Sequence, residues 1–141
     1  VIPIEFSEMS DGVKRILLLY TYIILAQIND VSLIAIEEPE NSIHPGLLKK
    51  YIIALDSFLE NTRVLITSHS PFLVNYIKTE SLYIGIPNEE GLAIFRKIKE
   101  SSVSKIYSDA DELDMLVGEY LFDLMSVSSN TNTLLKYINN E

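Results

Sequence analysis

The sequence SLIAIEEPENSIHP, residues 32–45, contains a short apolar run that ends in two carboxylates. The run, residues 33–36, is uncharged and rich in Ile and Leu, which predicts a strand buried on both faces of a parallel sheet. Glu37 and Glu38 follow it, and two acids are costly to desolvate unless a cation meets them. Because ligands of open α/β sheets bind beyond the carboxyl ends of the strands, we expect a metal ion and phosphates here. Pro39 then ends the strand.

A second strand of the same kind is predicted at residues 64–67, within the sequence RVLITSHS. The segment between the two strands, residues 45–60, has apolar side chains at helical spacing and a proline in its first turn, which predicts an amphipathic helix. A right-handed β-α-β crossover brings parallel strands together, so we expect His69 to lie near Glu38. The simpler alternative is a histidine that a neighbour satisfies and that serves the structure only.

The polar sequence SEMSDG, residues 7–12, precedes a predicted helix at residues 13–29. Ser10 or Asp11 could cap this helix, and a serine hydroxyl beside free helix-start amides also makes an anion site. The apolar run inside the helix is shorter than the about 20 residues that cross a bilayer. Acids rather than basic residues precede the run, which argues against a signal peptide. The sequence therefore predicts a buried helix and no association with a membrane.

The composition is that of a globular domain. The chain has 141 residues, 48% of them hydrophobic and 9% aromatic, enough for one domain with a core. No cysteine occurs, so disulfides and thiolate metal sites are excluded. The net charge of -9 argues against this segment gripping a nucleic-acid backbone by itself.

The C-terminal part is predicted as a β-hairpin, a polar connection, an acidic helix and a tail. The hairpin pairs residues 81–86 with residues 91–98, and the polar connection covers residues 100–108. The acidic helix is expected at residues 109–125. The tail consists of a polar linker from residue 126 and a short helix at residues 134–138. Asp109 is the expected cap of the acidic helix. Asp111, Glu112 and Asp114 suit its dipole, and their spacing matches no metal loop. We therefore expect two parts, residues 1–125 and 126–141.

Two of these segments resemble motifs of ABC-type ATPases. IAIEEPENSIHP is similar to the Walker B and D-loop segment of the SMC-like, RecF-like and OLD-type members, and ITSHSPFLV is similar to their H-loop. The turn MSDG resembles the signature motif that opens a helix before Walker B. The resemblance implies an α/β fold, the C-terminal half of a P-loop NTPase head, with a parallel sheet flanked by helices.

The resemblance also implies roles for individual residues. Glu37 would bind Mg²⁺, Glu38 would be the general base or orient water, and His69 would contact the γ-phosphate of ATP. The residues expected to act on nucleotide across a dimer of heads are Ser10 and Gly12 in the signature turn and Asn41 and Ser42 in the D-loop. His44 is either a solvent residue or helix cap, or part of that interface. Lys14 and Arg15 either face solvent or neutralise phosphate.

None of the five glycines is followed by Lys-Ser or Lys-Thr, so the sequence contains no P-loop. We therefore expect this chain to need an N-terminal half that carries the P-loop, and to be inactive as an ATPase alone. The resemblance implies a cytoplasmic ATPase whose heads form a homodimer on ATP, in DNA repair or in phage or plasmid defence, with DNA contacts through other regions. The alternative is a non-catalytic interaction or scaffold module that retains the motifs. A metal nuclease is a poor third choice, because the helix acids have no evident route to the strand ends.

Overall fold

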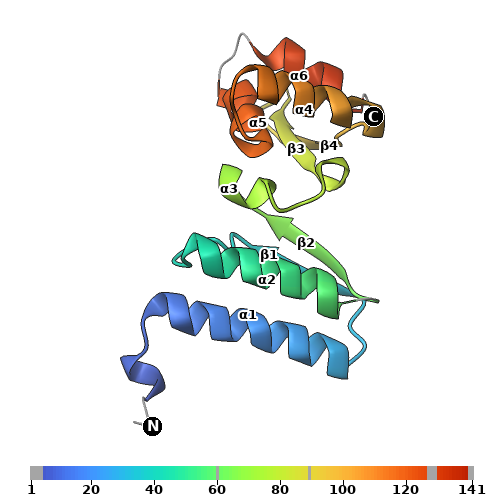
Figure 1. Ribbon diagram of the computed structural model, residues 1–141. Coiled ribbons are helices and arrows are strands. Elements are labelled where there is room, and N and C mark those ends of the chain that lie inside the picture. The colour runs from blue at the N-terminus through green and yellow to red at the C-terminus, as the bar shows by residue number, and fades with distance from the viewer. Residues whose placement is uncertain (1–4, 60, 89, 127–129, 140–141) are drawn as a thin grey trace. The chain divides into compact units, whose positions relative to one another are not determined.

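The computed structural model describes residues 5–59, 61–88, 90–126 and 130–139 (Figure 1). The chain divides into two compact units, residues 1–69 and 70–141. Each unit is described by itself. Within the described residues, no helix has both the length and the apolar character that a bilayer span requires.

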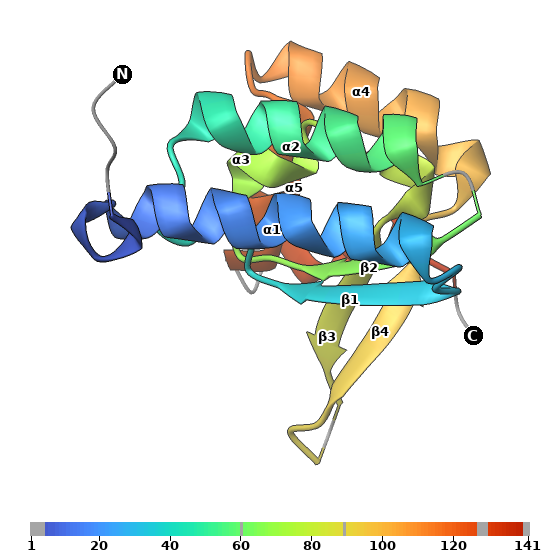
Figure 2. The same ribbon diagram turned by 90° about the horizontal axis from the view of Figure 1, so that it is seen from below.

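The first unit is a β-α-β unit with an additional helix before it. In chain order it contains η1 (Phe6–Glu8), α1 (Asp11–Ile28), β1 (Leu33–Glu37), α2 (Pro45–Phe58) and β2 (Arg63–Thr67). β1 and β2 are parallel neighbours, in register from Leu33 opposite Arg63 to Glu37 opposite Thr67. Figure 2 shows the two strands side by side, with α1 and α2 next to them. The predicted strands, helices and parallel pairing of this unit are confirmed.

The core of the first unit lies between its helices and one face of the strand pair. It is formed by apolar side chains of both helices and of the strand end: Leu19, Ile23, Ala26, Ile36, Leu48, Tyr51, Ile52 and Leu55. The rings of Tyr20 and Tyr51 meet edge to face with centroids 5.7 Å apart. Burial raises the pKa of Tyr51.

The expectation that both faces of these strands are buried is wrong for this chain. Side chains alternate along each strand, and the odd-numbered ones point away from the core. Leu33 is 54% exposed and Leu65 is 55% exposed. The two helices contact only one face, so an apolar strand face is left facing outward.

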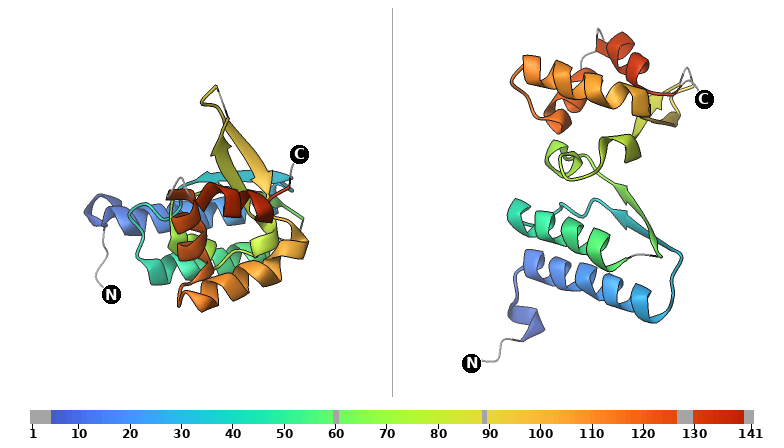
Figure 3. Two further views of the ribbon diagram at one scale, coloured as in Figure 1. Left: turned by 90° about the horizontal axis from the view of Figure 1, so that it is seen from above. Right: turned by 45° about the vertical axis from the view of Figure 1, so that its right-hand side comes forward.

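The second unit combines short helices with a two-stranded antiparallel sheet. It contains α3 (Pro71–Val74), η2 (Thr79–Ser81), β3 (Tyr83–Pro87), β4 (Ala93–Lys97), η3 (Glu100–Ser102), α4 (Val103–Glu112), α5 (Val117–Ser126) and α6 (Thr131–Tyr137). The pairing of β3 with β4 confirms the predicted hairpin. Figure 3 shows α4 and α5 in orange and α6 in red, and contacts link α5 to each of the other two.

The acidic helix differs from the prediction in two ways. The expected polar connection at 100–108 is largely helical, and the expected single helix at 109–125 is two helices, α4 and α5. Asp114 has φ +55°, a left-handed conformation that ends α4 locally. Asp109 is not a cap but lies inside α4, because Ile106 and Ala110 supply a buried face that starts the helix earlier.

Polar contacts fix the second unit's core around Tyr137. The Tyr137 hydroxyl donates to Asp109, which also accepts from Lys105 at 3.1 Å. The Tyr120 hydroxyl lies 3.0 Å from the Tyr137 hydroxyl. Tyr137 belongs to α6, whose Leu134 is also buried in this core. The division into residues 1–125 and a linker with a tail helix, residues 126–141, stays a prediction. α6 packs within the second unit. Residues 127–129 of the expected linker lie outside the described residues.

Candidate functional site

The carboxyl ends of β1 and β2 form the centre of the candidate site. Glu37 is the last residue of β1, and Glu38 follows with φ +42°. The Glu38 N–H continues the ladder by donating to the Thr67 carbonyl at 2.9 Å. A left-handed conformation at a non-glycine residue costs about 1–3 kcal/mol and persists only where the surroundings enforce it. The strain falls on Glu38, the residue to which the family resemblance assigns the role of general base.

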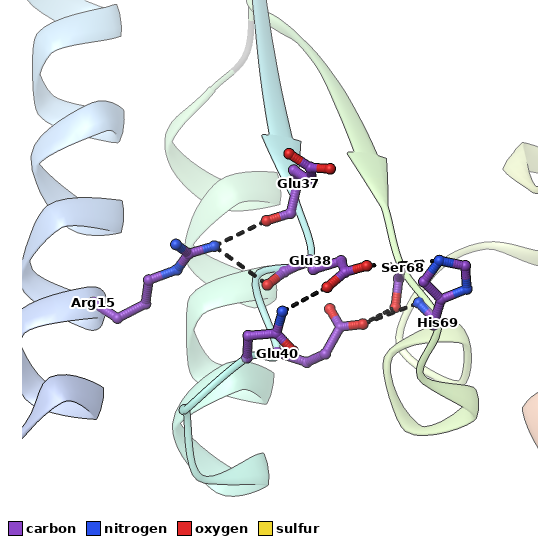
Figure 4. Close-up of polar contacts among 7 residues, drawn as sticks. Arg15, Glu37, Glu38, Glu40, Ser68 and His69 are labelled. Atoms are coloured by element: carbon purple, nitrogen blue, oxygen red, sulfur yellow. Dashed lines mark hydrogen bonds and ion pairs between the residues drawn. The ribbon is translucent and has the colours of Figure 1, made fainter.

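Both carboxylate oxygens of Glu38 have a contact. The Asn41 amide donates to Oε2 at 2.5 Å. Nε2 of His69 lies 3.6 Å from Oε1, as Figure 4 shows. The His69 side chain is 89% exposed and that of Glu38 is 34% exposed, so this pair lies at the surface of the first unit. The expected closeness of His69 and Glu38 is confirmed, and their catalytic roles stay predictions.

Glu40 is a site residue that the sequence analysis missed. Its Oε1 accepts from the Ser68 hydroxyl at 2.5 Å and from the His69 N–H at 3.1 Å (Figure 4). Its Oε2 is buried and has no hydrogen-bond partner among the described residues. The signal in the sequence was a third acid within EEPE, placed two residues beyond Glu38 where the loop must turn toward β2.

Arg15 has a structural contact that the sequence analysis did not suggest, and its neutralisation of phosphate stays a prediction. From α1 its guanidinium donates to the carbonyl of Glu37 at 2.9 Å and to that of Glu38 at 3.3 Å (Figure 4). Its Nε is buried and lacks a partner among the described residues. Arg15 therefore ties the helix after the signature turn to the backbone of the two acids.

The predicted phosphate-contacting residues have local structural roles. Ser10 is the N-cap of α1 and accepts from the Val13 N–H at 3.4 Å, which confirms the capping interpretation. A Cβ on Gly12 would meet the Ser42 carbonyl at 2.4 Å, so only glycine permits this approach. The signature turn and the loop at 41–44 therefore touch within one chain. Contacts of Ser10, Gly12, Asn41 and Ser42 with nucleotide stay predictions.

His44 is a helix cap. It is the N-cap of α2, and its Nδ1 accepts from the Gly46 N–H at 3.2 Å. This confirms one of the two roles that the sequence left open. A contact across a dimer interface stays a prediction.

The residues present fit a magnesium ion only as part of a larger site. No group of three or more acidic or histidine side chains converges within the described part of the chain. The Glu37 side chain is exposed at the strand end. Mg²⁺ is commonly held by one or two carboxylates together with waters and substrate phosphates. Glu37 would be such a ligand, which stays a prediction.

The fold is similar to that of a solved ATPase structure. A solved structure described as "Structural biochemistry of ATP-driven dimerization and DNA stimulated activation of SMC ATPases" matches with a TM-score of 0.57 and 9% sequence identity. The match covers 73% of this chain and 62% of that chain, so this chain spans less than two thirds of the protein it resembles. The fold is therefore that of an SMC-like head, a P-loop NTPase fold.

The sequence places the chain in a family. Residues 2–75 match the family described as "AAA domain, putative AbiEii toxin, Type IV TA system". A comparison with curated proteins gave no match. The chain belongs to this AAA-domain family, and the matched residues include the whole candidate site.

Proposed function

We propose that the chain is the C-terminal half of an ATP-hydrolysing head. The observation that carries the proposal is the position of Glu38 and His69, whose side chains meet at the ends of two parallel strands. This is the edge of an α/β sheet where ligands bind. The family and the fold both belong to ATPases, which supports the same conclusion.

In this proposal Glu38, His69 and Glu37 have separate roles in ATP hydrolysis. Glu38 accepts a proton from the attacking water or orients it, and its strained conformation keeps the carboxylate at the strand end. His69, which lies just after the end of β2, donates a hydrogen bond to the γ-phosphate of ATP. Glu37 holds Mg²⁺, which when bound neutralises charge on the β- and γ-phosphates.

The phosphate cradle comes from a segment outside this sequence. The sequence has no P-loop, and the outward strand face at Leu33 and Leu65 is apolar and exposed. α1 likewise exposes Leu17, Ile24 and Ile28, although a helix that is apolar on all sides is normally buried. We assign these surfaces to the packing of the N-terminal half of the head.

The heads are proposed to dimerise on ATP. Ser10 at the start of α1 and the loop at 41–42 form one continuous surface, because Gly12 packs on Ser42. In a dimer this surface would face nucleotide bound by the other head. The work driven by the cycle is proposed to be DNA repair or phage or plasmid defence, which fits a family described by a toxin system and a structure described by DNA-stimulated activation.

A non-catalytic module is the second candidate. The observation that favours it is that Asn41 and His69 already engage the Glu38 carboxylate, and that capping alone accounts for Ser10. In such a module the motif residues would serve the loop structure only.

ATP turnover by the protein that contains both halves separates the two candidates. E38Q should abolish turnover while ATP still binds, because the amide cannot accept the proton. E112Q is the matched control, since Glu112 is an exposed glutamate at the end of α4, and it should leave turnover unchanged. The 141-residue chain alone should show no turnover. Equal turnover in E38Q and the parent would overturn the role of Glu38, and a parent without turnover would favour the non-catalytic module.

A further inference from the structure

Glu40 connects the loop after β1 to the loop after β2. It lies two residues beyond Glu38, and its Oε1 accepts from the Ser68 hydroxyl at 2.5 Å and the His69 N–H at 3.1 Å. One carboxylate oxygen thus holds the backbone of the residue whose imidazole faces Glu38. Figure 4 shows the Glu40 side chain reaching across to the Ser68 and His69 segment.

The position of the His69 ring depends on this anchor. The ring is 89% exposed, so packing does not fix it, and its Nε2 lies 3.6 Å from Oε1 of Glu38. The ring must therefore be positioned mainly through its own backbone. Glu40 holds that backbone, while Asn41, the next residue, holds Glu38 itself. Adjacent residues in one loop thus position both members of the pair.

The Glu40 carboxylate also carries a buried oxygen that no hydrogen bond compensates within the part of the chain that the structure describes. Its second oxygen, Oε2, is buried without a partner among the described residues, and an unpaired buried polar atom lowers stability. Local rules of this kind are broken most often at functional sites.

We propose that Glu40 is a positioning residue that sets the spacing between Glu38 and His69 for ATP hydrolysis. The proposal rests on the proposed function of the pair. Glu40 itself does not touch the nucleotide. It acts through the His69 backbone, so its loss should lower the turnover number and leave ATP binding intact.

The first measurement is steady-state ATP turnover of the protein that contains both halves, with E40A, E40Q and the control E112A. E40A should lower kcat about ten- to a hundred-fold with little change in KM, which is the size expected for a misplacement of about 1 Å. E40Q keeps the accepting oxygen and should recover most of the activity. A parent-like kcat in a folded E40A, or a loss through KM alone, would overturn the proposal.

The second measurement reads the histidine without ATP. In protein labelled with ¹⁵N-histidine, the His69 ring signals are assigned by their loss in H69Q. E38Q should move these signals, and E40A should move them in the same sense because the ring leaves Glu38. S68A, which removes one of the two donors and keeps Glu40, should move them less and serves if E40A does not fold. Unmoved ring signals in both E40A and S68A would overturn the proposal. If the parent has no turnover but E40A moves the ring, the proposed function fails while the positioning by Glu40 holds.

Discussion

The two units differ in how fully the oxygens of their acidic side chains are hydrogen-bonded. In the second unit both oxygens of Asp109 have partners, one in Lys105 and one in Tyr137. In the first unit Glu40 buries an oxygen without a partner, and Glu38 has a left-handed backbone. All the buried side-chain atoms without a partner in the described residues, on Arg15, Glu40 and Tyr51, belong to the first unit. Two of these atoms, on Arg15 and Glu40, lie beside the candidate site, whereas the second unit is a scaffold whose polar network around Asp109 is satisfied.

Replacing one glycine in each unit by alanine tests this comparison, and it has the largest expected effect on the free energy of unfolding. A Cβ on Gly118 of α5 would lie 2.0 Å from the Pro71 carbonyl oxygen, inside packed helices. G118A should lower the free energy of unfolding by about 3 kcal/mol, because both backbones must move. G12A, in the first turn of α1, creates a similar overlap at 2.4 Å with the Ser42 carbonyl, but Ser42 lies in an exposed loop that can shift, so the cost should be clearly smaller.

Urea unfolding of both variants gives these free energies. G46A is the control, because a Cβ there would make an ordinary contact of 3.4 Å with the His44 ring in the first turn of α2. It should leave the midpoint nearly unchanged. An equal loss in G12A and G118A would mean that the site loop is as rigidly packed as the scaffold, and the contrast between the units would fail.

The sequence alone was enough to predict the β-α-β unit and the pair at its strand ends. Two apolar runs separated by an amphipathic helix allow few arrangements, and the crossover rule then brings His69 to Glu38. The contacts that hold the pair were not predictable. The reach of Glu40 depends on the left-handed turn at Glu38, and Arg15 contacts a carbonyl that lies 22 positions away in the chain.

The break between α4 and α5 shows a second limit of sequence reasoning. Residues 109–125 contain no proline and only one glycine, so local propensity favours one continuous helix. Asp114 nevertheless takes φ +55°, and the Glu119 side chain accepts from the Leu116 N–H at 3.2 Å just before α5 begins. The close approach of Gly118 to Pro71 requires α5 to take its own direction. Tertiary packing therefore overrides the local preference.

Arg15 allows a test of intermediate size within the first unit. R15A removes the donor that the Glu37 and Glu38 carbonyls share, and it should lower the free energy of unfolding by about 1–3 kcal/mol. R15K should recover only part of this loss, because a single ammonium replaces a planar fork. Urea titration provides the values.

The neighbouring lysine provides the control for Arg15. Lys14 lies 3.8 Å from the exposed carboxylate of Asp11, so K14A should change stability by less than about 1 kcal/mol. If K14A cost as much as R15A, the effect would reflect loss of positive charge near the acids and not the contacts to their carbonyls.

The smallest expected effect concerns the satisfied acid of the second unit. The Tyr137 hydroxyl and then the Lys105 ammonium hold the pKa of Asp109 below its ordinary value of 3.8. A carboxyl whose pKa is lower in the folded state stabilises the protein above its unfolded pKa, and this stability is lost as the pH falls through the folded pKa. Acid titration of thermal unfolding should therefore show a shallower loss of stability below about pH 4 in D109N than in the parent. D111N, at an exposed aspartate on the same helix, should keep the parent's acid profile. If D109N and the parent lose stability equally on acidification, the Asp109 carboxylate does not stabilise this network. The contrast with the incompletely bonded Glu40 would then fail.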